Sequence, residues 1–277
     1  SMREHIVRVG KVSFGNRLPA AFIAGPCVIE SEGLLRTVAR ALHKACRELK
    51  AGLVLKASFD KANRTSVKSY RGPGIEEGLR TLAKVAAEFG VPCVSDVHEP
   101  AHAAVAARYV DMLQVPAFLS RQTDLLLACG RTGKAVNVKK GQFLSPWDMK
   151  HAVEKLLSTG NRRILLTERG ASFGYGNLIV DMRSYEIMRG FGFPVIHDAT
   201  HCVQLPGGNG ATTGGQRQFV RPLARAAAAV GVAGVFFETH PDPDKALSDG
   251  PNSLPLASVP AFLREIRRFD ALSKELA

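Results

Sequence analysis

Four residues that can bind a metal ion share a local setting although they lie far apart in the chain. They are Cys27 in AGPCVIES, His201 in DATHCVQ, Glu238 in FFETH and Asp249 in ALSDGPN. The first three follow or end short apolar runs typical of β-strands, and Asp249 lies in the loop after the last run. One thiolate, one imidazole and two carboxylates suit one borderline divalent ion of the Zn, Fe or Mn class. Each residue alone could be structural, but the set predicts a metal-assisted enzyme.

A group of basic residues shares this placement at the ends of strand-like runs. Its members are Lys61, Arg64, Lys139 and Arg169, with Arg121 after the fourth run. Together they offer more positive charge than one small anion requires, because a single phosphate or carboxylate is satisfied by one or two such side chains. The group is expected to bind two phosphates and a carboxylate.

Eight strand-like runs alternate with helical patterns along the chain, which is typical of repeated βα units. The runs cover residues 21–25, 53–58, 92–97, 112–117, 135–140, 164–169, 194–199 and 234–239. This number favours a (β/α)8 TIM barrel of the α/β class over a doubly wound sheet, which usually has fewer strands. In such barrels the active site lies at the carboxyl ends of the strands.

The flanking segments fit the same architecture. An apolar stripe after Ser31, a plausible N-cap, predicts one helix, and Pro260 begins the pattern of the terminal helix. Residues 6–18 alternate like a β-hairpin, so residues 1–18 are expected to close the N-terminal end of the barrel. We expect one domain over residues 1–277, in which Ser1 looks like a cloning remnant.

Two long loops carry different signals. Residues 56–74 are dense in Lys, Arg, Ser and Asn, a composition that favours ligand binding. Residues 206–215 contain five glycines, so they form either a lid or an irregular surface loop, and a lid is favoured.

Composition excludes several classes of function. The chain has 277 residues, 45% of them hydrophobic, and a net charge of +12. Its basic residues are scattered rather than clustered with aromatics, which argues against a nucleic-acid-binding protein. No apolar run approaches the ~20 residues that span a bilayer, so a cytoplasmic protein without membrane contact is expected. Five cysteines without a C-x-x-C pair do not suggest a disulfide framework.

Several longer motifs closely resemble the 3-deoxy-D-manno-octulosonate 8-phosphate synthase family. They occur in the family's order and cover the chain after the N-terminal hairpin: KASFDKANRTS, DVHE, QVPAFLSRQTDLL, NVKKGQF, TERGASFGYGNLIVDMRS, DATHCVQ and HPDPDKALSDGPN. The resemblance implies a transferase of lipopolysaccharide biosynthesis, usually a homotetramer. It would join phosphoenolpyruvate, arabinose 5-phosphate and water into 3-deoxy-D-manno-octulosonate 8-phosphate and phosphate.

The resemblance also assigns roles to individual residues. Phosphoenolpyruvate would contact Ser58, Lys61, Gln114, Ala117, Lys139, Gln142 and Arg169. The sugar phosphate would contact Asn63, Arg64, Thr65 and Asp96, with Arg121 supplied by a neighbouring subunit. The expected catalytic centre comprises Lys61, Lys139, Cys27, His201 and Asp249.

Cys27 indicates a subclass, because the family has metal-dependent members with cysteine at this position and metal-independent members with asparagine. The chain departs from the family at Thr65, where serine is common, at Cys202, another frequent serine, and at His197, a frequent phenylalanine. None of these changes removes a ligand. The nearest alternative is a 3-deoxy-D-arabino-heptulosonate 7-phosphate synthase that uses erythrose 4-phosphate. That family usually carries a KPRTSP-like segment, whereas KANRTS here supplies Asn63.

Overall fold

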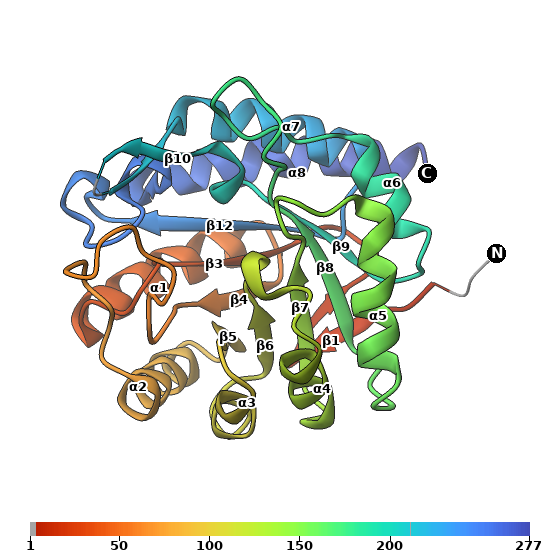
Figure 1. The fold of residues 1–277 in the computed structure, drawn as a ribbon. Coiled ribbons are helices and arrows are strands. Elements are labelled where there is room, and N and C mark those ends of the chain that lie inside the picture. Colours follow the sequence, from red (N-terminus) through yellow and green to blue (C-terminus); the bar gives the residue numbers. More distant parts are fainter. Residues whose placement is uncertain (1–3, 211) are drawn as a thin grey trace.

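Eight parallel strands close into a barrel in this computed structural model, which describes residues 4–210 and 212–277 (Figure 1). In chain order they are β3 (Ala21–Gly25), β4 (Leu53–Lys56), β5 (Cys93–Asp96), β6 (Met112–Val115), β7 (Ala135–Lys139), β8 (Ile164–Glu168), β9 (Val195–Asp198) and β12 (Gly234–His240). Gly234 closes the barrel, because it pairs with Ile196 of β9 on one side and Ala21 of β3 on the other. The predicted (β/α)8 barrel is confirmed.

Helices form a ring around the barrel, each lying against its neighbours or the sheet (Figure 1). They are α1 (Glu32–Glu48), α2 (Ile75–Glu88), α3 (Pro100–Ala106), α4 (Thr123–Arg131), α5 (Met149–Leu157), α6 (Arg183–Arg189), α7 (Val220–Val230) and α8 (Val259–Glu275). Short 3-10 helices cover Ala117–Leu119, Pro146–Asp148, His201–Val203, Arg217–Phe219, Pro243–Lys245, Gly250–Asn252 and Leu256–Ser258. Ser31 is the N-cap of α1, as predicted, and accepts a hydrogen bond from the Leu34 amide at 3.1 Å.

Two apolar cores follow from the alternation of side chains along each strand. The outward residues pack against the helices in one large core. The inward residues form a smaller core inside the barrel, built from Ala21, Ile23, Val54, Val94, Met112, Ala135, Leu165, Ile196, Ala233 and Phe236. Polar inward residues therefore lie above this apolar layer, toward the carboxyl ends of the strands.

An antiparallel hairpin of β1 (Val7–Val9) and β2 (Val12–Phe14) closes the other end, as predicted (Figure 1). Its four apolar side chains belong to the inner core. Asn16 fastens the hairpin, because its side chain donates to the Phe193 carbonyl and accepts from the Val195 amide, both at 2.9 Å.

The glycine-rich segment forms a second hairpin at the opposite end from β1 (Figure 1). Strand β10 (Gln204–Asn209) pairs with β11 (Thr212–Gly215), while the short β13 (Leu254–Pro255) pairs with β12. The less favoured alternative, an irregular surface loop, was therefore wrong, and residue 211 lies outside the described residues. Lid motion stays a prediction.

None of the described helices combines the length and the apolar character that crossing a bilayer requires. All five cysteines are buried and free of disulfides, in agreement with the sequence.

Candidate active site

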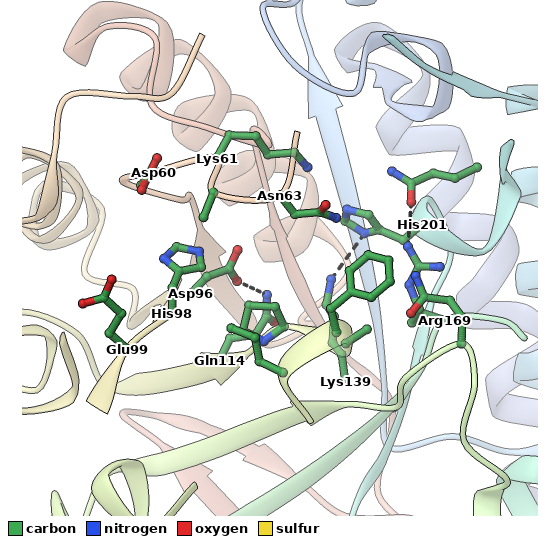
Figure 2. Close-up of a pocket in the computed structure, with 17 residues that line it drawn as sticks. Asp60, Lys61, Asn63, Asp96, His98, Glu99, Gln114, Lys139, Arg169 and His201 are labelled. Atoms are coloured by element: carbon green, nitrogen blue, oxygen red, sulfur yellow. Dashed lines mark hydrogen bonds between the residues drawn. The ribbon is translucent and has the colours of Figure 1, made fainter. Parts of the chain in front are cut away.

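A cavity of about 410 Å³ opens at the carboxyl ends of the barrel strands (Figure 2). Nine predicted residues line it: Lys61, Asn63, Asp96, Gln114, Ala117, Lys139, Gln142, Arg169 and His201. They come from the carboxyl ends of β5, β6 and β7 and from the segments that follow β4, β6, β7, β8 and β9. Residues from six parts of the chain thus meet where the barrel fold predicts an active site.

A second cavity, of about 280 Å³, adjoins the first, because Lys61 and Asn63 line both. It adds Arg64, Thr65 and Asp249. Two regions that each contain basic side chains therefore belong to one continuous site, one within the barrel mouth and one along the loop after β4.

The inner region is held by an ion-paired group of three side chains. Lys139 Nζ lies 2.7 Å from Asp198 Oδ2, and His201 Nδ1 lies 2.8 Å from the same oxygen. Burial would raise the pKa of Asp198, but His201 and Lys139 hold it well below its usual value. Burial would lower the pKa of His201, but Asp198 and Glu238 raise it to about 9. A metal ion bound at Nε2 would displace that proton.

The four predicted metal ligands come together beside this group. The ligand atoms of Cys27, Glu238 and Asp249 all lie within 4.8 Å of one another. His201 Nε2 lies 3.2 Å from Glu238 Oε1 and 3.5 Å from Asp249 Oδ2. Burial raises the pKa of the Cys27 thiol, and the two carboxylates raise it further. A soft thiolate, an imidazole and two carboxylates at these distances fit a borderline divalent ion.

Two lysines balance the carboxylates of this cluster. Lys56 Nζ pairs with Glu238, and Lys61 Nζ lies 2.6 Å from Asp249 Oδ2. Because buried charges are costly without partners, these pairs let both acids stay ionised inside the protein. Burial would raise the pKa of Asp249, but Lys61 and His201 hold it well below its usual value.

Arg169 differs from the lysines because it forms no ion pair with any carboxylate in the part of the chain that the structure describes. Its guanidinium is buried and donates to Gln204 Oε1 at 2.6 Å, and Nη1 has no hydrogen-bond partner among the described residues. Burial lowers its pKa, against the attraction of surrounding acids. A buried guanidinium with a nitrogen still free to donate is well suited to bind an anion.

Four predicted residues line neither cavity: Cys27 and Glu238 of the metal cluster described above, and Ser58 and Arg121. Ser58 lies beside the site and donates to Asp96 Oδ2 at 2.8 Å. Arg121 is exposed and lines a separate surface hollow with Phe143 and Asp148. The expectation that Arg121 serves a neighbouring subunit stays a prediction.

The sequence assigned no individual role to several residues that contribute to the site. Asp198 and Lys56 pair with predicted residues, Phe236 lies under Lys139, and Gln204 holds Arg169. His98 and Phe118 also line the larger cavity. Asp198, Lys56 and His98 end or follow strands, as the predicted residues do, but their partners were not evident from the chain. In the sequence, Phe236 is not distinguishable from an ordinary apolar core residue.

Fold and site together define a barrel enzyme with an anion-binding centre and a candidate metal site at the carboxyl ends of its strands. The chain belongs to the DAHP synthetase I family, whose model matches residues 4–275.

Three relatives share most of its length. A protein of Syntrophotalea carbinolica is 61% identical over 268 residues, covering 97% of each chain. One of Geobacter sulfurreducens is 56% identical over 268 residues, which is 97% of this chain and 98% of the relative. One of Trichlorobacter lovleyi is 55% identical over 264 residues, 95% of this chain and 97% of the relative. All three are named 2-dehydro-3-deoxyphosphooctonate aldolase.

Proposed function

We propose that the protein condenses phosphoenolpyruvate with arabinose 5-phosphate and water, giving 3-deoxy-D-manno-octulosonate 8-phosphate and inorganic phosphate. The observation that carries the proposal is the pair of adjoining cavities, in which Lys139 and Arg169 lie at one end and Arg64 at the other. Such a site suits two phosphorylated substrates bound end to end. The names of the relatives support the same reaction, a transferase step of lipopolysaccharide biosynthesis.

The residues divide between the two substrates. Lys61, Lys139, Gln142 and Arg169 would hold the phosphate and carboxylate of phosphoenolpyruvate, with Ser58, Gln114 and Ala117 nearby. Asn63, Arg64 and Thr65 would bind the phosphate of the sugar, and Asp96 would accept hydrogen bonds from its hydroxyls. Because both substrates are anions, this charge offsets their repulsion and brings the reacting carbons together.

The reaction forms one carbon–carbon bond. C3 of phosphoenolpyruvate attacks the aldehyde carbon of the sugar, and the aldehyde oxygen takes a proton. Water adds at C2 and loses a proton to a base of the site, and the C–O bond to phosphate then breaks. The lysines and Arg169 stabilise the charge that gathers on the phosphate as it leaves.

We also propose one divalent ion of the Zn, Fe or Mn class per subunit, held by Cys27, His201, Glu238 and Asp249. When bound, the ion supplies Lewis acidity that polarises or orients the aldehyde or a water. The residues Lys56 and Lys61 then balance the two carboxylate ligands. Cys27 supports assignment to the metal-dependent subclass.

A cytoplasmic homotetramer is proposed for the assembled enzyme, with residues 1–277 of each chain as one domain. Arg121 is exposed near Phe118 and Phe143, which are 54% and 48% exposed although large and apolar. A neighbouring subunit packed on this surface would cover the aromatic side chains and bring Arg121 toward a second site.

A comparison of two aldoses tests the proposed function. Purified protein is assayed for phosphate release from phosphoenolpyruvate with arabinose 5-phosphate or erythrose 4-phosphate. Faster turnover with arabinose 5-phosphate is expected. Asn63 lines the region proposed for the sugar phosphate, and the relatives are named 2-dehydro-3-deoxyphosphooctonate aldolase. Faster turnover with erythrose 4-phosphate would support the heptulosonate alternative, which the names of the relatives do not favour.

A further inference from the structure

Five polar side chains form a continuous hydrogen-bonded row across the inner wall of the barrel, from β8 to the segment after β4. Thr167 Oγ1 donates to Asn137 Oδ1 at 2.6 Å, and Asn137 Nδ2 donates to Gln114 Oε1 at 2.9 Å. Gln114 Nε2 donates to Asp96 Oδ1, and Ser58 Oγ donates to Asp96 Oδ2 at 2.8 Å. Asn137 and Thr167 lie outside the site described above.

The strand register places these residues in line. Asp96 lies opposite Gln114, and Gln114 lies opposite Asn137. Thr167 is on the inner face of the next strand, two residues beyond Leu165, which lies opposite Asn137. The row therefore occupies one polar layer directly above the apolar core inside the barrel.

Asp96 sets the direction of every bond in the row. Burial would raise the pKa of Asp96, but Lys56 and Lys139 hold it below its usual value, so the carboxylate is ionised and only accepts. Gln114 must then turn its amide nitrogen toward Asp96 and its oxygen toward Asn137. Asn137 must in turn direct its nitrogen to Gln114 and its oxygen to Thr167, whose hydroxyl donates.

Burial makes this direction costly to reverse. Asn137 and Thr167 are fully buried, and Gln114 is 1% exposed. A flipped amide would place two oxygens or two N–H groups against each other without water to relieve the mismatch. The hydroxyl of Thr167 satisfies the Asn137 oxygen in the orientation that Asp96 sets, and so supports the Gln114 amide two residues along the row.

This orientation matters because Gln114 and Asp96 line the larger cavity, whereas Asn137 and Thr167 do not (Figure 2). The oxygen of Gln114 is engaged with Asn137, so the amide has its second N–H left to offer a ligand. A donor suits an anion held by Lys139 and Arg169, while a carbonyl oxygen turned to the same place would repel it.

We propose that Asn137 and Thr167 are positioning residues, which lock the Gln114 amide so that it presents an N–H group to phosphoenolpyruvate. The proposal deepens the proposed function and rests on it for the identity of the ligand. Both residues act through Gln114 and touch no substrate themselves.

Direct binding of phosphoenolpyruvate to the purified protein tests this role without requiring turnover. Thr167→Val keeps the shape of the side chain but removes the donor, and is expected to raise the Kd about tenfold, the effect of one lost buried hydrogen bond. Thr167→Ser restores the donor and should bind within about twofold of wild type. Ser95→Ala is the matched control, since it removes a buried hydroxyl next to Asp96 that has no partner among the described residues.

A double-mutant comparison separates positioning from a general loss of packing. In a Gln114→Ala background, Thr167→Val should cause no further loss of affinity, because the amide through which it acts is gone. A tenfold loss that persists in this background would overturn the proposal, as would wild-type affinity of Thr167→Val alone.

Neutron diffraction from wild-type crystals gives a test that depends on neither a variant nor a ligand. The amide deuterons of Gln114 are expected toward Asp96, and those of Asn137 toward Gln114. Deuterons of Gln114 directed at Asn137 would overturn the proposal. A protein that binds phosphoenolpyruvate with these dependences but condenses it with neither aldose would refute the proposed function and leave the positioning role intact.

Discussion

The ammonium of Lys139 lies 3.8 Å from the centroid of the Phe236 ring. Phe236 is fully buried in the apolar layer inside the barrel, and Lys56 Nζ lies 5.8 Å from the same centroid. The negative face of an aromatic ring attracts a cation by roughly 0.5–2 kcal/mol. The floor of the active site therefore helps to hold positive charge where the anionic substrate would bind.

Phe236→Leu is expected to lower kcat/KM for phosphoenolpyruvate about twofold to thirtyfold, the range that corresponds to the loss of this attraction. Steady-state kinetics measure the change. Phenylalanine analogues with increasing ring fluorination keep nearly the same volume, so a graded fall in kcat/KM would identify the ring charge as the cause. Equal activity across that series would contradict the prediction.

Cys27→Ala should reduce the metal content of the purified protein, because it removes the thiolate of the proposed ligand set. Elemental analysis measures bound Zn, Fe and Mn per subunit. Cys46→Ala is the matched control, since Cys46 is a buried thiol on α1 outside the ligand cluster. Chelation of wild-type protein is also expected to abolish condensation, and full activity of metal-stripped protein would refute metal dependence.

Gly25→Ala is expected to prevent folding, because the added Cβ would lie 1.7 Å from the carbonyl oxygen of Lys56 on the neighbouring strand. Backbone cannot move that far without breaking the barrel. Gly33→Ala on α1 is the control, since nothing lies within 4 Å of its added Cβ. It should fold and gain a few tenths of a kcal/mol, up to ~1, from helix propensity. Soluble yield and thermal unfolding distinguish the two variants.

His197 makes the protein sensitive to acid. Burial lowers the pKa of His197 to about 4, despite the opposing effect of Asp198, and its Nδ1 contacts the hydroxyl of the equally buried Tyr185. The unfolded chain, with a histidine pKa near ~6.5, binds the proton more readily. Stability is therefore complete above about pH 6.5 and falls as the pH drops toward about 4, by roughly 3 kcal/mol in all.

His197→Phe should flatten this part of the pH profile, because phenylalanine does not titrate. Denaturant unfolding at several pH values between 4 and 7 measures the slope. Tyr185→Phe removes the partner but keeps the buried imidazole, so it should retain the acid sensitivity. An unchanged slope in His197→Phe would show that other groups cause the loss.

The strands were predictable because each βα unit carries its own local signal. All eight barrel strands fall within one or two residues of their predicted bounds, and the hairpin of residues 7–14 lies within the predicted segment 6–18. The glycines of residues 206–215 did not distinguish a loop from a hairpin, because glycine is compatible with both. The pairing of Gln204 with Gly215 depends on tertiary context.

The candidate site was predictable where a residue's type and its place at a strand end both indicated chemistry. Cys27, His201 and Glu238 satisfied both conditions, whereas Asp249 was indicated by its type and its place in the loop after the last strand. The structure brings all four together. Asn137 and Thr167 did not satisfy both conditions. Their role depends on hydrogen bonds to side chains on neighbouring strands. The register between neighbouring strands determines these partners, and the sequence of one strand alone does not predict that register.

The position of the hairpin in the chain also limits how early the barrel can finish folding during synthesis. Residues 7–14 leave the ribosome before the barrel strands, but the hydrogen-bond partners of the nearby Asn16, at Phe193 and Val195, are 177 and 179 residues further along. At about 5–20 residues per second of translation, the hairpin's valines stay without their final contacts for roughly ten to thirty seconds. A nascent chain of this protein thus carries an exposed apolar segment, which a chaperone could recognise until the seventh barrel strand arrives.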